Sequence, residues 1–149
     1  MWEKRLKKDF PKLTTHAFKI ESPADPKYNC IAWAAEISTI TWWPSPFPSP
    51  FCTWPRKPKG DGISEFIEVF ESMGYSICAS ADREEGCEKV AIYANKDNQP
   101  THMARQLPSG LWTSKCGRGG PDISHAIEGL EGDIYGDVKV ILKRSVECN

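Results

Sequence analysis

The sequence lacks a surplus of charge of either sign, and it lacks a long apolar run. Its 149 residues carry 19 Lys and Arg against 20 Asp and Glu, a net charge of -1. A nucleic-acid-binding domain is usually strongly basic, so this balance argues against a nucleic-acid partner. The basic cluster from Arg56 to Lys59 is expected to be a solvated stretch of loop. No apolar stretch approaches the roughly 20 residues of a membrane-spanning helix, so no membrane partner is expected.

Closely spaced metal ligands are also missing. The three histidines, His16, His102 and His125, form no His-x-x-x-His motif, and no two cysteines have Cys-x-x-Cys spacing. We therefore expect no metal, and nothing indicates a cofactor. The basic start of the chain has no apolar stretch behind it, which favours a cytoplasmic protein with reduced thiols. The six cysteines concerned are Cys30, Cys52, Cys78, Cys87, Cys116 and Cys148.

The length and a hydrophobic content of 40% fit a single domain over residues 1–149. Residues 1–28 form an N-terminal extension, in which a short basic helix is expected to end before Pro11 and residues 11–28 are expected to be irregular. Residues 41–60, here called the Pro/Trp loop, hold half of the 12 prolines and several aromatic residues. Proline excludes a helix or central strand there, so we expect an ordered loop insertion whose aromatic rings pack on the body. A polyproline segment read by a partner domain is the alternative.

The rest of the chain predicts an α+β domain. An apolar, Ala-rich stretch over 29–37 indicates a buried helix with Asn29 or Asp25 near its N-cap. Apolar residues at helical spacing predict an amphipathic helix over 63–73. The segment 121–125 looks like a further helix start, capped by Asp122. Short extended runs separated by turns then predict an antiparallel sheet, with strands over 75–80, 89–94, 102–107, 111–115 and 138–144.

Cys30 and His102 are the residues that could carry chemistry. Cys30 stands at the first turn of its predicted helix, where backbone N–H groups favour a thiolate, the nucleophilic form of cysteine. His102 begins a predicted strand after a turn, where a general base could stand. The alternatives are a buried core cysteine and a surface histidine near a turn.

A general base needs a second group that fixes its tautomer. If Pro108 to Gly110 close a hairpin, Gln106 lies opposite Trp112, and Ser114 shares a face with His102. Asp122 is the chemically better partner for His102 if its loop folds back, and we slightly prefer it. His125 is expected to be a solvated helix residue and remains a third alternative.

The order of these features resembles the papain-like cysteine enzymes, in particular the NlpC-type peptidases, amidases and acyltransferases, and among them a group of small bacterial domains. The resemblance extends from Tyr28 to Arg144. The local strings that carry it are Tyr28–Ala34, Lys89–Ala94, Thr101–Leu107 and Gly110–Lys115. It implies a papain-like core in which a cysteine-bearing helix packs on a small antiparallel sheet. NlpC-type enzymes usually carry Asp-Cys-Ser where this chain has Asn29-Cys30-Ile31, and no Gln precedes Cys30, so the oxyanion donors would have to be backbone N–H groups.

The leading hypothesis is a cysteine-dependent acyl-transfer enzyme, that is, a peptidase, amidase, deamidase or transglutaminase-like protein acting on a protein or peptide amide. Cys30 would attack the carbonyl carbon, His102 would take and return the proton, and Asp122 or Ser114 would orient His102. Four tryptophans would bind the substrate: Trp33, Trp42, Trp43 and Trp54. The alternative is a non-catalytic interaction module, or an effector or toxin-type domain, that uses the Pro/Trp loop.

Overall fold

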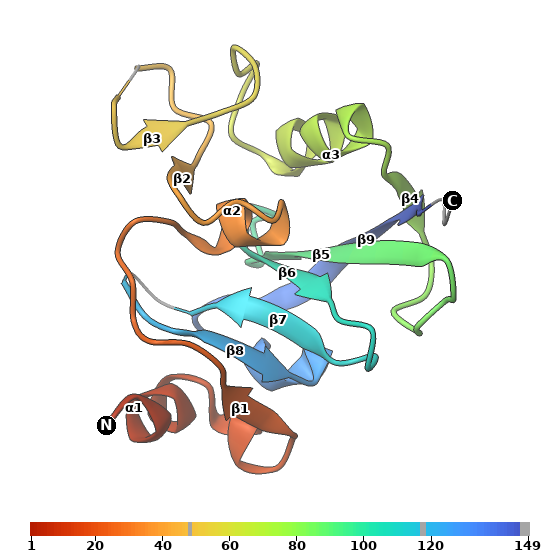
Figure 1. Ribbon diagram of the computed structural model, residues 1–149. Coiled ribbons are helices and arrows are strands. Elements are labelled where there is room, and N and C mark those ends of the chain that lie inside the picture. Colours follow the sequence, from red (N-terminus) through yellow and green to blue (C-terminus); the bar gives the residue numbers. More distant parts are fainter. Residues whose placement is uncertain (48, 117–118, 147–149) are drawn as a thin grey trace.

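The structure is a computed structural model that describes residues 1–47, 49–116 and 119–146. Pro48 of the Pro/Trp loop and Cys148 lie outside the described residues. The chain mixes helices and strands, which confirms the α+β class (Figure 1). No described helix is both long enough and apolar enough to cross a membrane. In chain order the elements are α1 (Trp2–Asp9), η1 (Pro11–Thr14), β1 (Phe18–Ile20), α2 (Cys30–Ala34), β2 (Thr41–Trp42), β3 (Cys52–Thr53), α3 (Ile63–Ser72), β4 (Ser76–Cys78), β5 (Cys87–Ala94), β6 (Pro100–Gln106), β7 (Trp112–Lys115), β8 (Asp122–His125), η2 (Ile127–Leu130) and β9 (Asp137–Ser145).

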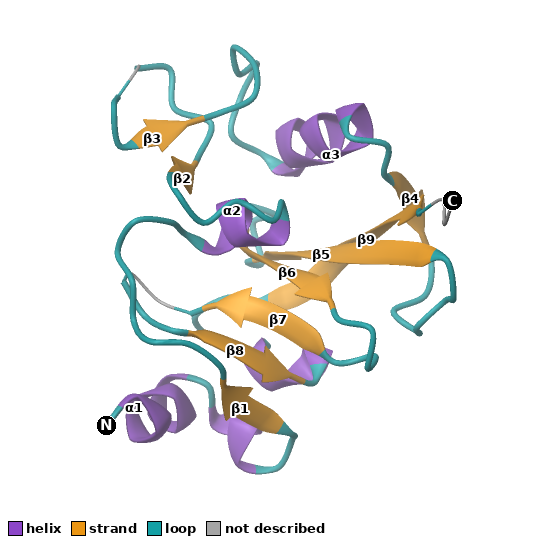
Figure 2. Ribbon diagram, viewed as in Figure 1, coloured by secondary structure: helices purple, strands orange, loops and turns teal. Residues whose placement is uncertain are grey.

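One antiparallel sheet of seven strands organises the molecule, in the order β1-β8-β7-β6-β5-β9-β4. The strands β2 and β3 form a separate parallel pair at the two ends of the Pro/Trp loop. Helices α2 and α3 lie on one side of the sheet and α1 lies on the other (Figure 2). We call these sides the α2 face and the α1 face.

Neighbouring residues of each central strand belong to different faces, because side chains alternate along a strand. On β5, Val90 and Ile92 pack with α2 and α3, whereas Ala91 and Tyr93 pack with α1 and η1. On β6, Met103 belongs to the α2 face. The direction of any β6 or β7 side chain is therefore decided by whether its number is odd or even.

The predicted basic helix near the start of the chain and the predicted amphipathic helix are both confirmed. Helix α1 ends at Asp9, shortly before Pro11. Helix α3 buries Phe66, Val69 and Phe70, the apolar stripe that the spacing predicts. Gly74, which follows α3, has a φ of 98°, a left-handed conformation that favours glycine and ends the helix.

Two predictions about local structure are wrong. The segment 121–125 is not a helix start, because Asp122–His125 forms the buried strand β8. The N-terminal extension is not irregular throughout, because Phe18–Ile20 forms strand β1 and pairs with β8. The predicted β6–β7 hairpin is confirmed: Gln106 lies opposite Trp112, and the N–H of Leu107 donates to the Leu111 carbonyl.

The Pro/Trp loop is held to the body at one buried carboxylate. Glu65 on α3 is 2% exposed. It accepts hydrogen bonds from Trp54 Nε1 at 2.7 Å, from Arg56 Nη2 at 2.9 Å and from the Lys59 backbone N–H at 3.0 Å. Arg56 also reaches Glu68, so the basic cluster is partly an ion-pair anchor and not only a solvated stretch.

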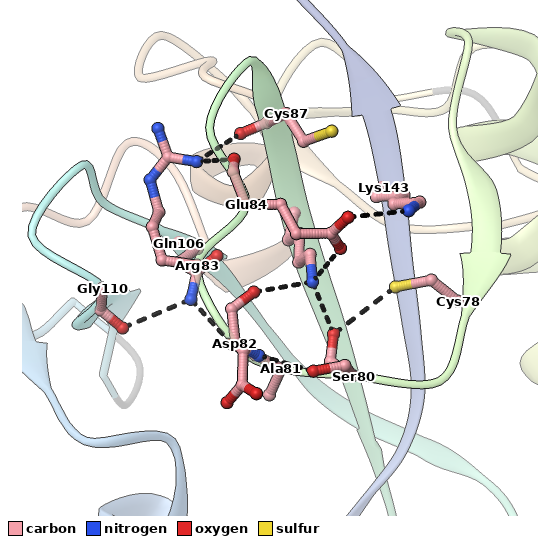
Figure 3. A network of polar contacts seen from close by, with 11 residues as sticks. Cys78, Ser80, Ala81, Asp82, Arg83, Glu84, Cys87, Gln106, Gly110 and Lys143 are labelled. Carbon is pink, nitrogen blue, oxygen red and sulfur yellow. Dashed lines mark hydrogen bonds and ion pairs between the residues drawn. The ribbon is translucent and has the colours of Figure 1, made fainter.

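A buried lysine fixes the loop between β4 and β5. Lys89 is fully buried on β5, and its ammonium donates to the Ser80 and Asp82 carbonyls, each at 2.7 Å, and pairs with Glu84 at 2.6 Å. Figure 3 shows Glu84 reaching also to Lys143 on β9, at 3.0 Å. Because the charge is buried with its hydrogen-bond partners, it ties this loop to the sheet.

Candidate functional site

A cleft of about 1000 Å³ opens on the α2 face, beside the start of α2 and under the Pro/Trp loop. Its inner residues are buried, and those at its mouth are exposed: Tyr28, Lys115 and Tyr135 are 7%, 1% and 8% exposed, whereas Phe51 is 81% exposed. A preformed hollow with aromatic walls and a few polar groups is the usual form of a ligand site. The residues used below, all of them lining the cleft, are Tyr28, Cys30, Trp43, Phe51, Lys115 and Tyr135.

Asn29 fixes the start of α2 against the Pro/Trp loop. As the helix N-cap, its Oδ1 accepts the Ala32 N–H at 3.1 Å, which confirms one of the two predicted caps. The same oxygen accepts the Trp42 N–H at 3.0 Å, and Nδ2 donates to the Trp42 carbonyl at 2.8 Å. One side chain therefore positions both the helix that carries Cys30 and the first strand of the loop.

Cys30 is the first residue of α2 and faces the cleft. Burial is the largest influence on the pKa of its thiol and raises that pKa to about 11. Hydrogen bonds from the backbone N–H groups of Met103 and Ile31 and the charge of Lys115 act in the opposite direction and favour the thiolate. At neutral pH Cys30 is therefore a protonated thiol that needs a proton acceptor before it can act as a nucleophile.

His102 is fully buried in a chain of hydrogen bonds on the α1 face. Its Nε2 lies 2.8 Å from Ser114 Oγ, which lies 2.7 Å from His125 Nε2. His125 Nδ1 donates to the Ala126 carbonyl at 2.7 Å, so in a neutral ring Nε2 accepts the Ser114 hydroxyl. Ser114 Oγ then accepts His102 Nε2–H. Within the described residues, His102 Nδ1 has no hydrogen-bond partner.

Burial lowers the pKa of both histidines, that of His125 to about 4 and that of His102 well below its ordinary value. The His102 ring also stacks on Tyr135, with 4.1 Å between ring centroids and 11° between planes. Both imidazoles are therefore neutral at physiological pH. His125 is not the solvated helix residue expected from the sequence, because it lies buried at the end of β8.

The structure does not bring Cys30 and His102 together. Met103 faces α2 and belongs to the same packing cluster as Cys30. His102 is its neighbour on β6, so it points to the opposite face and contacts Tyr93 and Tyr135 there. The sheet itself separates the expected nucleophile from the expected base.

The two candidate orienting residues go to different faces. Ser114 is bonded to His102, as the hairpin register predicts. Asp122 lies opposite Lys115 in the β7–β8 pair, on the α2 face, and is 5% exposed. It hydrogen-bonds the Tyr28 hydroxyl and acts on the charge of Lys115. Asp122 therefore belongs to the surroundings of the cleft and does not orient His102.

Of the four tryptophans expected to bind substrate, Trp43 lines the cleft. Trp54 and Trp43 line a second hollow of about 470 Å³ on the outside of the loop. Trp42 packs edge-on against Trp54, with 6.2 Å between ring centroids. Trp33 Nε1 donates to Thr113 Oγ1 at 2.9 Å, and the Arg105 guanidinium lies 5.3 Å from its ring. Trp33 and Trp42 therefore have packing roles.

Sequence reasoning missed Lys115 and Phe51. Lys115 donates to the Gly120 carbonyl, and its Nζ lies 5.0 Å from the centre of the Tyr28 ring. Its position follows from the hairpin register, since the residue after Ser114 must face the other side of the sheet.

Phe51 and Phe47, 81% and 78% exposed, were expected to pack on the body, and the structure leaves both rings in solvent. In the part of the chain that the structure describes, no three acidic, Cys or His residues form a metal-binding group.

Comparisons with known proteins give one match. The model of a family described as "Domain of unknown function (DUF7689)" matches residues 19–143, which is most of the chain and includes every cleft residue discussed above. No curated protein and no solved structure matches the chain.

Proposed function

The chain belongs to the DUF7689 family, whose description assigns no activity, and we propose from the cleft that it is a binding module for a peptide segment of a partner protein. The observation that carries this proposal is the exposed aromatic rim of a deep, preformed cleft. Trp43, Phe47 and Phe51 are 37%, 78% and 81% exposed, and the first and last of them line the cleft. Exposed aromatic rings grouped at the mouth of a hollow are typical of binding surfaces.

The rim is held in place before any ligand arrives. Asn29 bonds the first strand of the Pro/Trp loop, and Glu65 bonds its far end through Trp54 and Arg56. A preordered loop loses little conformational entropy on binding, so aromatic contacts on it contribute more of their gross energy to affinity. This supports recognition of an extended apolar segment that lies across Trp43 and Phe51.

Peptide display tests the proposal. A library of random peptides is selected against the protein, and enriched peptides are synthesised and titrated against the wild type and two variants. Phe51→Ser removes a ring at the mouth of the cleft. Ile77→Ser removes an apolar side chain of comparable exposure, 59%, on the edge strand β4.

We expect Phe51→Ser to weaken binding about tenfold or more, since burying one aromatic side chain contributes about 2 kcal/mol. Ile77→Ser should leave the dissociation constant within about twofold. Peptides that bind Phe51→Ser as tightly as the wild type, or a selection that enriches nothing over an empty support, would show the proposal to be wrong.

A second candidate is cysteine-dependent acyl transfer at Cys30, on the papain-like, NlpC-type core that the sequence resembles. The observation that favours it is that Cys30 lines the same cleft. A Cys30–His102 dyad oriented by Ser114 or Asp122 would require His102 to act through the sheet, so this candidate needs a different proton acceptor. Either function fits a cytoplasmic protein, since a reducing compartment keeps a thiol such as Cys30 free.

A further inference from the structure

We infer that Lys115 is the proton-accepting partner of Cys30, and that the two form a thiol–amine pair that can take an acyl group from an ester or thioester donor. This deepens the second candidate function and does not depend on the peptide-binding proposal. Lys115 would thus act as the general base, the role that the sequence analysis expects of His102.

The two side chains share one space. Cys30 begins α2, Lys115 ends β7, and both line the cleft. Ser114 points to the α1 face, where it bonds His102 and His125, so its neighbour Lys115 must point toward α2. The interaction is also electrostatic: the Lys115 charge favours the Cys30 thiolate, and a Cys30 thiolate favours the charged amine.

Several groups hold Lys115 in position. Its amine donates to the Gly120 carbonyl and lies over the Tyr28 ring. The carboxylates of Asp122 and Asp25 favour its charged form. Asp122 is fixed in turn by the pairing of β8 with β7 and by the Tyr28 hydroxyl. Lys115 is thus a buried amine with defined orientation rather than a mobile surface cation.

Burial gives the amine the character of a base. Desolvation lowers the pKa of Lys115, because a charged amine is poorly solvated there, and the two carboxylates only partly oppose this. An uncharged Lys115 can accept the proton of the Cys30 thiol, and the charged amine formed in this way then stabilises the thiolate beside it. His102 is neutral as well, but its ring is enclosed between Tyr93 and Tyr135 on the other face.

The step balances without any further reactant. The Cys30 sulfur attacks the carbonyl carbon of R–CO–X, so an S–C bond forms and the C–X bond breaks. The thiol proton moves to the Lys115 amine and then to the leaving group X. The products are a Cys30 thioester and HX, and no redox change occurs.

Labelling of the intact protein tests the inference with two probes, iodoacetamide and p-nitrophenyl acetate. Peptide mass mapping assigns each label to its cysteine, and Cys87 serves as an internal reference. The variants are Lys115→Met, Lys115→Arg and His102→Gln, each first checked for folding by circular dichroism. Rates are measured from pH 7 to pH 10.

With iodoacetamide, loss of the neighbouring charge in Lys115→Met should slow labelling of Cys30 about tenfold, equivalent to raising the thiol pKa by about one unit. Lys115→Arg keeps the charge and should label at the wild-type rate. p-Nitrophenyl acetate also reacts with the thiolate, so acetylation of Cys30 should follow the same order: about tenfold slower in Lys115→Met and retained in Lys115→Arg. His102→Gln should match the wild type with both probes.

The inference is overturned if Lys115→Met and wild type label Cys30 equally, or if His102→Gln slows either reaction more than Lys115→Met does. If Lys115→Met does not fold, Lys115→Gln, which also removes the charge and the proton acceptor, takes its place. None of these results affects the peptide titrations, so the two proposals can fail separately.

Discussion

Replacing Glu65 by Gln should loosen the Pro/Trp loop and destabilise the fold. The carboxylate is 2% exposed and accepts hydrogen bonds from Trp54, from Arg56 through Nε and Nη2, and from the Lys59 backbone. A Gln side chain fits the same space, but it carries no charge and has only one acceptor oxygen. The Arg56 guanidinium would then lose its buried partner, while Glu68 on the next turn remains available to it.

The size of the effect follows from the titration of Glu65. Its hydrogen bonds, first of all those from Arg56, lower its pKa from 4.5 to about 2. A difference of about 2.5 pKa units corresponds to at most about 3.4 kcal/mol. The Arg56 side chain is 30% exposed, so solvent screens part of this interaction. We therefore expect Glu65→Gln to lower the free energy of unfolding by about 2 kcal/mol at pH 7.

The sign of the pH dependence makes the reasoning testable. A carboxyl group whose pKa is depressed in the folded state stabilises the protein above its unfolded pKa of about 4.5, and this contribution is lost as pH falls toward 2. Urea denaturation of wild type and Glu65→Gln at pH 7 and pH 3 measures it. The matched control is Glu71→Gln, an exposed position on the same helix. The reasoning is refuted if the two proteins unfold at the same urea concentration at pH 7, or if the difference between them is as large at pH 3.

Three further perturbations test the rest of the structure. Ser114→Ala removes the hydroxyl between two buried histidines and should lower the free energy of unfolding by about 2–4 kcal/mol, measured by thermal denaturation. Ser64→Ala, at an exposed position of α3, should leave it nearly unchanged. Acidification should destabilise the wild type, because burial lowers the pKa of His125 to about 4. The neutral histidine contributes its full stability above pH 6.5, and up to about 3 kcal/mol is lost as pH falls toward 4. In urea titrations His125→Gln should lose less stability than the wild type over that interval, and an equal loss would contradict the burial argument. Lys89→Met removes the buried ammonium and should speed hydrogen exchange and proteolysis within residues 79–86, while the Pro/Trp loop stays unaffected. Unchanged exchange within residues 79–86 would show that Lys89 does not hold this segment.

Elements with a strong period were predictable, and those that depend on tertiary pairing were not. The apolar stripe of α3 and the β6–β7 hairpin follow from local spacing and turn chemistry. Strand β8 was mistaken for a helix start because Asp122, Ser124 and His125 are polar, yet all three are buried by pairing with β7 and β1. Strand β1 has three residues and no strong local pattern, and its partner β8 lies more than 100 residues later in the chain.

The candidate site shows the same division. Cys30 at the start of its helix, Asn29 as the N-cap of that helix and Ser114 beside His102 agree with expectations drawn from the sequence. The Cys30–His102 pair does not, because strand alternation sends His102 and Met103 to opposite faces, and a shift of one residue would have reversed the outcome. Sequence order can place a histidine on a strand next to the cysteine helix, but it does not say which side of that strand the helix covers.

The two ends of the sheet have a consequence for self-association. Its outermost strands, β1 and β4, have three residues each, so neither offers a long row of open backbone groups to another chain. Strand β9 extends beyond β4, but there the Val138 N–H is already bonded to Glu131 Oε2 at 3.0 Å. Short or occupied edges resist the strand-to-strand stacking by which sheets polymerise. Even at high concentration, copies of this protein should therefore stay separate along their strands.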